Sequence, residues 1–324
     1  MPDLPLVTVG LPTYNREWSL PRVLESLLAL DYEKKRLRVC FVDNRSEDRT
    51  MEIIESFRGA HQREYERILI VSMRSNIPKA RNAVFEAAEG TDYVFFLDSD
   101  VVAPPRALKN LLATFEEDPK VGMAALPCDN RNARRRAGFL YRAFAVPFGP
   151  HDAYKVATCC TLISMAAHGK VGGFDEVLRV HEDSEFSFRV RRAGFRVVSD
   201  SSLEGDHLRD IPVDTFFYIR FMKDSAATYR ELMLRGSLLH ISKVLLSYLL
   251  LASFVALLLR PGVPALASFA ALLAVCAWLN SSAMALDDGA HTRLLYRPVI
   301  GLIFTVTTFL ISILLVPALF RRAG

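Results

Sequence analysis

Short apolar runs rich in branched and aromatic residues recur along the N-terminal part of the chain and predict buried β-strands. These runs are Leu6–Leu11, Leu37–Val42, Ile68–Val71, Tyr93–Leu97 and Val121–Leu126. Segments with apolar residues at helical spacing separate the runs, at Leu20–Leu30, Asp48–Phe57, Lys79–Glu89 and Arg106–Glu117. Because strands and helices alternate, we predict an α/β domain whose mostly parallel sheet is flanked by helices on both faces.

The last quarter of the chain has a different pattern. Residues 261–286 and 298–320 contain no charged side chain, and each segment exceeds the roughly 20 residues that a helix needs to cross a bilayer. A third apolar stretch precedes them, with a lysine and a histidine whose polar ends could reach the headgroups. We therefore predict three transmembrane helices, at about 239–259, 263–285 and 298–320.

An aromatic and basic stretch, Pro212–Leu234, precedes the first predicted span. Its composition is typical of an amphipathic helix that lies on a membrane surface, although an ordinary packed helix of the globular domain would also fit. The predicted organisation is therefore a globular domain over residues 1–210, an interfacial helix over 211–237 and a transmembrane region over 238–324.

Charge supports this division of the chain. The sequence holds 40 Lys and Arg against 36 Asp and Glu, a net charge of +4, which is too small an excess to indicate a nucleic-acid partner. The first residues show no basic segment followed by a long apolar run, so no signal peptide is expected. Arginines close to the predicted spans favour a cytoplasmic globular domain. We expect a multi-pass protein of the cell membrane.

The cysteine pattern argues against a disulfide framework and against a structural zinc site. The five cysteines include no C-x-x-C pair, and Cys159 and Cys160 are neighbours within an apolar run. Such a pattern is more typical of a reducing compartment.

Polar residues cluster where the predicted strands end. The segments Pro12–Arg16, Val42–Thr50 and Asn76–Asn82 follow the first three strands, and Asp98-Ser99-Asp100 follows the fourth. Ligands bind at the carboxyl ends of parallel strands. Two carboxylates one residue apart can point at one place and offer oxygen ligands to Mg²⁺ or Mn²⁺, which take further ligands from substrate phosphates. We therefore expect a site for a divalent cation and a phosphate-bearing ligand.

A second acidic motif is Glu182-Asp183, which precedes apolar residues at helical spacing. Asp183 could be the N-cap of a helix. It could also be a general base that removes a proton from a hydroxyl group. The sequence leaves both interpretations open, and they are compatible.

Six segments resemble, in order and spacing, the family 2 glycosyltransferases of the GT-A fold. They are Pro12–Arg16, Val42–Asn44, Ala80–Asn82, Leu97–Asp100, Gly172–Glu176 and Glu182–Asp183. The resemblance extends over roughly residues 5–210 and implies an enzyme with a GT-A, Rossmann-like catalytic domain.

The resemblance also implies roles for individual residues. Those expected to border the nucleotide are Pro12, Thr13, Asn15, Asp43, Arg81, Asp98 and Ser99, with Asp43 bonding to the base and Asp98 to the ribose. Those expected to hold the metal or approach the diphosphate are Asp98, Asp100 and His207. Asp183 would be the catalytic base, with Glu182 beside it.

The implied reaction moves a sugar, with inversion, from a nucleoside-diphosphate donor to an acceptor hydroxyl, assisted by Mg²⁺ or Mn²⁺. A UDP-sugar is the expected donor because it is the commonest in the family. The predicted spans favour an acceptor in the membrane, either a lipid or a lipid-linked saccharide. An ionised polyprenyl phosphate would need no base, so the intact Glu182-Asp183 favours a hydroxyl.

Four alternatives remain. The first is a polyprenyl-phosphate glycosyltransferase. The second is a processive polysaccharide synthase, but Phe217–Phe221 keeps only the arginine of the Q-x-x-R-W motif that such enzymes carry. A nucleotidyltransferase is disfavoured because Pro12–Arg16 is not a glycine-rich phosphate loop, and a non-catalytic membrane scaffold because the acidic motifs are intact. The basic run Arg131–Arg142 is either a solvated loop or a lid that meets anionic lipid.

Overall fold

The computed structural model describes residues 4–129, 150–153, 155–178 and 180–208, together with scattered positions between 245 and 274. Two compact units divide the chain, residues 1–177 with 182–211, and residues 178–181 with 212–324. The sheet, helices and site described below belong to the first unit.

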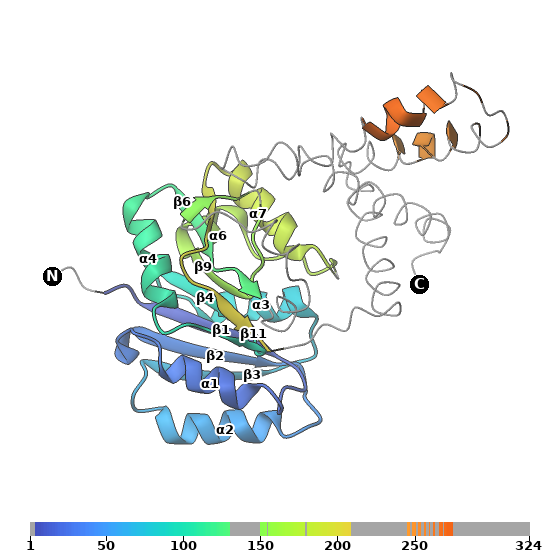
Figure 1. Cartoon of the computed structure of the whole chain (residues 1–324). Coiled ribbons are helices and arrows are strands. Elements are labelled where there is room, and N and C mark those ends of the chain that lie inside the picture. Colours follow the sequence, from blue (N-terminus) through green and yellow to red (C-terminus); the bar gives the residue numbers. More distant parts are fainter. Residues whose placement is uncertain are drawn as a thin grey trace. The chain divides into compact units, whose positions relative to one another are not determined.

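The centre of the first unit is an eight-stranded sheet with the order β3-β2-β1-β4-β9-β6-β10-β8 (Figure 1). All five predicted strands are present in it: β1 (Val7–Thr13), β2 (Leu37–Asp43), β3 (Arg67–Ser72), β4 (Tyr93–Leu97) and β6 (Val121–Ala125). β1 pairs in parallel with both β2 and β4, and β2 pairs in parallel with β3. The carboxyl ends of these four strands therefore meet at one edge, as predicted.

The sheet also contains strands that the hydrophobic pattern did not indicate. β9 (Cys160–Ser164) lies between β4 and β6 and runs antiparallel to both. β10 (Arg196–Asp200) extends the sheet in parallel with β6, and β8 (Pro150–Asp152) pairs antiparallel to β10. The sheet is thus mostly parallel but mixed.

A small second sheet has the order β5-β11-β7. It is formed by β5 (Val101–Val102), β7 (Cys128–Asp129) and β11 (Gly205–His207). β5 follows Asp98-Ser99-Asp100 directly, and Val101 pairs with His207. This pairing brings His207 close to the acidic motif although more than a hundred residues separate them in sequence.

Helices cover both faces of the main sheet (Figure 1). One hydrophobic core joins it to α1 (Leu20–Leu28), α2 (Thr50–His61) and α4 (Ala107–Glu117). The other joins it to α3 (Ile77–Ala87), α6 (Met165–Val171) and α7 (Glu182–Arg192). Successive side chains of β4 point to opposite faces of the sheet and contribute to both cores. Phe95 and Leu97 lie in the first core, and Val94 and Phe96 lie in the second. A short 3₁₀ turn, η1 (Lys34–Arg36), leads into β2.

Side-chain hydrogen bonds just before two helices accompany their departure from the predicted bounds. α2 begins at Thr50 rather than Asp48, because Asp48 lies in the preceding loop and accepts a hydrogen bond from the Thr50 backbone N at 3.0 Å. α3 begins at Ile77, two residues before the predicted Lys79, because Asn76 caps it by accepting from the Lys79 backbone N at 3.0 Å.

The predicted membrane segments fall mainly outside the described residues. The interfacial helix over 211–237 and the span 298–320 lie wholly outside them, as do Arg131–Arg142, Phe217–Phe221 and Cys276, and the spans 239–259 and 263–285 are described only at scattered positions. In the described part of the chain, we find no helix with the length and apolar character needed to cross a membrane.

His168 on α6 gives the fold a predicted dependence on pH. Its ring stacks on Phe85 with the centroids 4.0 Å apart, and burial, followed by the charge of Arg189, lowers the pKa of the imidazole below its ordinary 6.5. Since the folded state favours the neutral ring, this stabilising contribution is present above about pH 6.5 and is lost as the pH falls below it.

We expect His168→Phe to flatten the fall in stability on the acid side. Urea unfolding between pH 7.5 and 5 should show a smaller decrease in the free energy of unfolding for the variant than for the wild type, whatever the absolute effect of the larger ring. Equal slopes over this range would contradict the assignment.

Candidate active site

The loops that follow β1 and β2 are tied together by polar side chains. Asp43 is fully buried and accepts hydrogen bonds from Ser46, at 3.0 Å from its N and 2.5 Å from its Oγ. The Asn15 backbone N donates to Ser46 Oγ at 2.9 Å, and Asn15 Oδ1 accepts from the Glu47 N at 2.9 Å. Asn15 takes a positive φ of 50°, which asparagine tolerates better than most residues. Asn15 and Asp43 thus shape both loops.

Pro12 and Thr13 are the last two residues of β1, paired with Val42 and Asp43 of β2. The hydroxyl of Thr13 is buried and donates to the Leu11 carbonyl at 3.0 Å. Pro12 and Thr13 therefore belong to the sheet itself, at the end of β1 where the first loop of the site begins.

Asp98 and Asp100 follow β4, and each carboxylate meets an arginine. Asp98 Oδ1 lies 3.4 Å from Arg81 Nη2, and Asp100 Oδ2 lies 3.4 Å from Arg16 Nη2. The side chain of Asp98 is 30% exposed and that of Asp100 only 8%. Burial raises the pKa of Asp98, although Arg81 opposes the rise. Ser99 is buried between them, and its carbonyl accepts from Ser19 Oγ at 2.8 Å.

The second acidic motif opens α7. Glu182 is the first residue of the helix, so Asp183 lies within the first turn rather than at the N-cap position. Asp183 Oδ1 accepts from the Ser184 N at 2.7 Å. Carboxylates in the first turn also interact favourably with the helix dipole. The structure therefore excludes the N-cap interpretation of Asp183, which is partly exposed.

Arg81 joins the two acidic motifs. Its Nη1 donates to Glu182 Oε1 at 2.8 Å while its Nη2 faces Asp98, and its side chain is only 5% exposed. Burial opposes the charge on Arg81, but Asp98, Glu182 and Asp183 together hold its pKa above the ordinary value. Burial likewise raises the pKa of Glu182, against the effect of Arg81. The Arg81 guanidinium thus connects the first acidic motif, through Asp98, to the second, through Glu182.

His207 completes the region from β11. Its Nε2 lies 3.8 Å from Asp100 Oδ1, and its buried Nδ1 has no hydrogen-bond partner among the described residues. The carboxylates of Asp98 and Asp100 are the kind of ligand that Mg²⁺ and Mn²⁺ prefer, and the His207 imidazole lies next to one of them. Within the described ranges, however, no three His, Cys, Asp or Glu side chains are already grouped to hold a metal ion. The predicted set would need oxygen ligands from outside the protein.

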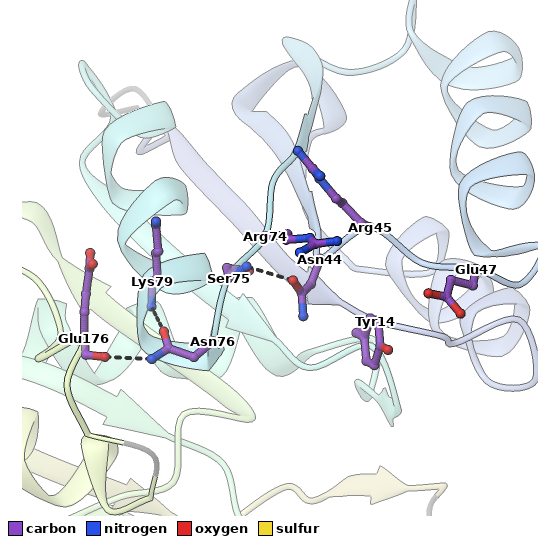
Figure 2. Close-up of a pocket in the computed structure, with 9 residues that line it drawn as sticks. All are labelled: Tyr14, Asn44, Arg45, Glu47, Arg74, Ser75, Asn76, Lys79 and Glu176. Carbon is purple, nitrogen blue, oxygen red and sulfur yellow. Dashed lines mark hydrogen bonds between the residues drawn. The ribbon is translucent and has the colours of Figure 1, made fainter. Parts of the chain in front are cut away.

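An open pocket of about 580 Å³ lies at the ends of β1, β2 and β3 (Figure 2). Its lining comes from the segments after β1, β2 and β3, from the start of α3 and from the segment before α7, and consists of Tyr14, Asn44, Arg45, Glu47, Arg74, Ser75, Asn76, Lys79 and Glu176. Among the hydrogen bonds drawn in Figure 2, those that join separate segments of the lining run from the Ser75 N to Asn44 Oδ1 at 2.7 Å and from Asn76 Nδ2 to the Glu176 O at 2.6 Å.

The pocket residues are neighbours of the predicted nucleotide residues rather than those residues themselves. Tyr14 and Asn44 adjoin Thr13 and Asp43, and Lys79 precedes Arg81 by two positions on α3. Because Tyr14, Asn44 and Lys79 lie in the segments that follow the predicted strands, the sequence already indicated them as candidates for ligand binding. Glu176 also had a signal, because it ends the Gly172–Glu176 segment of the resemblance, whereas Arg74 had none and reaches this pocket only through the fold. An exposed aromatic ring, Tyr14, beside cationic and amide side chains suits a planar base with attached phosphates.

Comparison with known proteins bears on the family and the fold of the chain. The model of the family described as Glycosyl transferase family 2 matches residues 8–172, about half of the chain. The chain is 26% identical to a chondroitin synthase of Escherichia coli over 195 residues, which is 59% of this chain and 27% of that protein. It is 33% identical over 111 residues to the poly(ribitol-phosphate) beta-N-acetylglucosaminyltransferase TarS of Staphylococcus aureus, 34% of this chain and 19% of that protein. The match thus spans about a quarter of the first relative and about a fifth of the second.

The fold is similar to that of a mannosyltransferase from Pyrobaculum calidifontis, solved in complex with GDP-Man and Mn²⁺. The two superpose with a TM-score of 0.62 at 20% identity, over 99% of this chain and 89% of that one. At this identity the likeness shows a shared architecture. With the family match over residues 8–172, it establishes that the chain belongs to glycosyltransferase family 2 and carries the GT-A domain of such an enzyme.

Proposed function

We propose that the protein is a membrane-anchored, inverting glycosyltransferase. It would move a sugar from a nucleoside-diphosphate donor to a hydroxyl of a membrane lipid or of a lipid-linked saccharide. The observation that carries the proposal is the bridge by Arg81, whose buried guanidinium contacts Asp98 at 3.4 Å and Glu182 at 2.8 Å. A donor-binding motif and a base motif held by one side chain suit a reaction in which both act on the same sugar.

The donor would lie along the carboxyl edge of the sheet. Its base would occupy the pocket beside Tyr14 and Asn44, and its diphosphate would extend towards Asp98 and Asp100. A UDP-sugar is the expected donor. The mannosyltransferase of similar fold was solved with GDP-Man, so a GDP-sugar is the first alternative to test.

A divalent cation would be held by Asp98 and Asp100, with His207 close by. When bound, such a cation neutralises negative charge that develops on a diphosphate leaving group. The protein's own contribution is to keep the two carboxylates in place, through Arg81 and through the pairing of β5 with β11.

Asp183 would remove the proton from the attacking hydroxyl as the new bond forms to the sugar. Attack opposite the leaving diphosphate inverts the configuration at the anomeric carbon. The position of Asp183 in the first turn of α7, next to the Glu182 that Arg81 holds, supports this role. Asp183 also adds to the negative charge around Arg81, which supports a base that acts in the same site as Asp98.

The acceptor is proposed from the sequence of the last quarter of the chain. Two segments there, 261–286 and 298–320, carry no charge and are long enough to cross a bilayer. A cytoplasmic catalytic domain attached to such segments would meet acceptors whose reactive ends lie at the membrane surface.

The test is a transfer screen with the full chain in detergent. UDP-sugars and GDP-sugars are offered with Mn²⁺ or Mg²⁺ to a glycolipid, a polyprenyl-diphosphate-linked saccharide and a polyprenyl phosphate. We expect release of nucleoside diphosphate and transfer to a hydroxyl acceptor, with both lost on adding EDTA and restored by Mn²⁺. The protein should stay in the membrane fraction after a carbonate wash.

Each contrary result has a distinct meaning. Transfer to polyprenyl phosphate alone would overturn the hydroxyl acceptor. Activity that persists in EDTA would overturn the role of the cation. No release from any UDP-sugar or GDP-sugar would overturn the proposed donor, and loss from the membrane fraction would overturn the anchor.

A further inference from the structure

The side chains of Arg16 and His207 already flank Asp100. Arg16 Nη2 lies 3.4 Å from its Oδ2, and His207 Nε2 lies 3.8 Å from its Oδ1. Only 8% of the Asp100 side chain is exposed, so little water is available to solvate its negative charge. The guanidinium of Arg16 therefore occupies the oxygen that a divalent cation would use.

Arg16 is held less firmly than Arg81. The Arg81 side chain is 5% exposed and contacts two carboxylates, whereas that of Arg16 is 25% exposed and contacts one. The other partners of Arg16 are neutral, since Nη1 donates to the carbonyls of Tyr14 at 3.1 Å and Asn15 at 3.4 Å. Its buried Nε has no hydrogen-bond partner among the described residues. Hydrogen bonds to neutral acceptors are weaker than those to ions, so this side chain can change partners.

The backbone of Arg16, in contrast, is fixed. Its N donates to Thr50 Oγ1 at 2.7 Å, and its carbonyl accepts from the backbone N of Ser19 at 3.1 Å and of Leu20 at 2.9 Å. The side chain can therefore reorient while the loop between β1 and α1 stays in place. Tyr14, two residues earlier in this loop, lines the pocket in Figure 2.

We propose that Arg16 is a positioning residue that pairs with Asp100 in the donor-free protein and transfers to the donor's diphosphate when a divalent cation binds. This inference rests on the proposed function. A guanidinium and a divalent cation repel each other when they share one carboxylate. Diphosphate oxygens offer the displaced guanidinium a bidentate partner of the kind it prefers.

The consequence is a coupling between the two ligands. A cation that binds alone must displace Arg16 from Asp100 without giving it another anion. A cation that binds together with a nucleoside diphosphate does provide one. Each ligand should therefore strengthen the binding of the other by the same factor, and Arg16 should set a large part of that factor.

The experiment measures Mn²⁺ binding to the full chain in detergent, from the electron paramagnetic resonance signal of free Mn²⁺, with and without UDP or GDP. For Arg16→Met we expect Mn²⁺ alone to bind about fivefold more tightly than to the wild type, the size of one modest ion pair. We also expect the nucleotide to enhance Mn²⁺ binding less than it does in the wild type. Arg16→Lys, which keeps the charge, should lie between the two.

The matched control is Arg22→Met. Arg22 belongs to α1 and lies 3.8 Å from Asp206, and its side chain is 60% exposed. The Arg22→Met variant loses the same charge at a position close to Arg16 in sequence, so this variant should bind Mn²⁺ as tightly as the wild type does. A purely structural role for Arg16 would weaken cation binding, whereas the proposal requires it to tighten.

The outcomes separate this inference from the function on which it rests. If the wild type binds Mn²⁺ with a nucleotide, and a folded Arg16→Met binds Mn²⁺ alone no more tightly than the wild type, only the role of Arg16 is overturned. Thermal unfolding confirms that the variant is folded. If the wild type binds no Mn²⁺ with either nucleotide, the cation site and the inference both fall.

Discussion

Replacing Asp183 with asparagine is expected to lower the turnover of sugar transfer by about 10²–10⁴-fold, the usual contribution of a general base. Donor binding should change little, because the donor contacts are proposed to lie along the ends of β1, β2 and β4. The amide variant keeps an oxygen that can accept the hydrogen bond from the Ser184 N, now 2.7 Å from Asp183 Oδ1. The start of α7 should therefore be preserved, and the effect should fall on the proton transfer.

A matched control lies in the same helical turn. Glu185 pairs with Arg189, with Oε1 2.6 Å from Nε, and that arginine also donates to the carbonyl of Val171 at 2.6 Å. Glu185→Gln removes one negative charge from the first turn of α7, as Asp183→Asn does, but from a side chain engaged elsewhere. Its turnover should stay within a few-fold of the wild type.

The measurement is steady-state transfer beside equilibrium binding of the donor nucleotide in Mn²⁺. A fall in turnover with nearly unchanged nucleotide affinity identifies Asp183 as the base. A fall of similar size in Glu185→Gln would instead attribute the effect to the helix terminus. Turnover of Asp183→Asn within a few-fold of the wild type would show that the acceptor needs no base, as an ionised phosphate acceptor would not.

The strands nearest the site were predictable because their signals are local. Tyr93–Leu97 is a short apolar run that ends in Asp98, and the observed β4 has the same bounds. β9 was missed because Cys160–Ser164 runs on into the apolar start of α6 without a turn signal. Its antiparallel place between β4 and β6 depends on pairing with Phe95 on one side and Ala124 on the other, which no local pattern encodes.

The same distinction applies to the site. That Asp43 and Asp98 lie at the same edge of the sheet could be expected, because β2 and β4 both run parallel to the β1 strand between them, and the acidic motifs could be recognised from their spacing. The partners of these acids could not be predicted from the sequence, because the hydrogen bond from Arg81 to Glu182 joins residues 101 positions apart. Arg16 was noted only as part of a loop, and its contact with Asp100 depends on how the β1–α1 loop folds over β4.

Replacing Arg81 with methionine is expected to destabilise the domain by about 3 kcal/mol at neutral pH, the lower end for breaking a buried ion pair. The variant would leave Glu182, 11% exposed, and Asp98, 30% exposed, without their shared counter-ion. We take the lower end because Asp98 keeps some contact with water. Lys79→Met is the control, since this exposed residue two positions earlier on α3 should change stability by no more than about 0.5 kcal/mol.

The destabilisation by Arg81→Met should also depend on pH. The direction of this dependence follows from the pKa shifts of Asp98 and Glu182. Burial already raises the pKa values of Asp98 and Glu182 above their ordinary 3.8 and 4.5, and Arg81 opposes the rise. Without Arg81 both pKa values rise further, so the folded variant is penalised wherever the unfolded chain would ionise these groups. The difference in the free energy of unfolding should be largest near pH 8 and shrink as the pH falls towards 4.5, where protonation removes the unpaired charges. Urea unfolding of wild type and variant across this range measures it, and a loss that stays constant with pH would mean that Arg81 stabilises the fold through packing rather than by balancing the two acids.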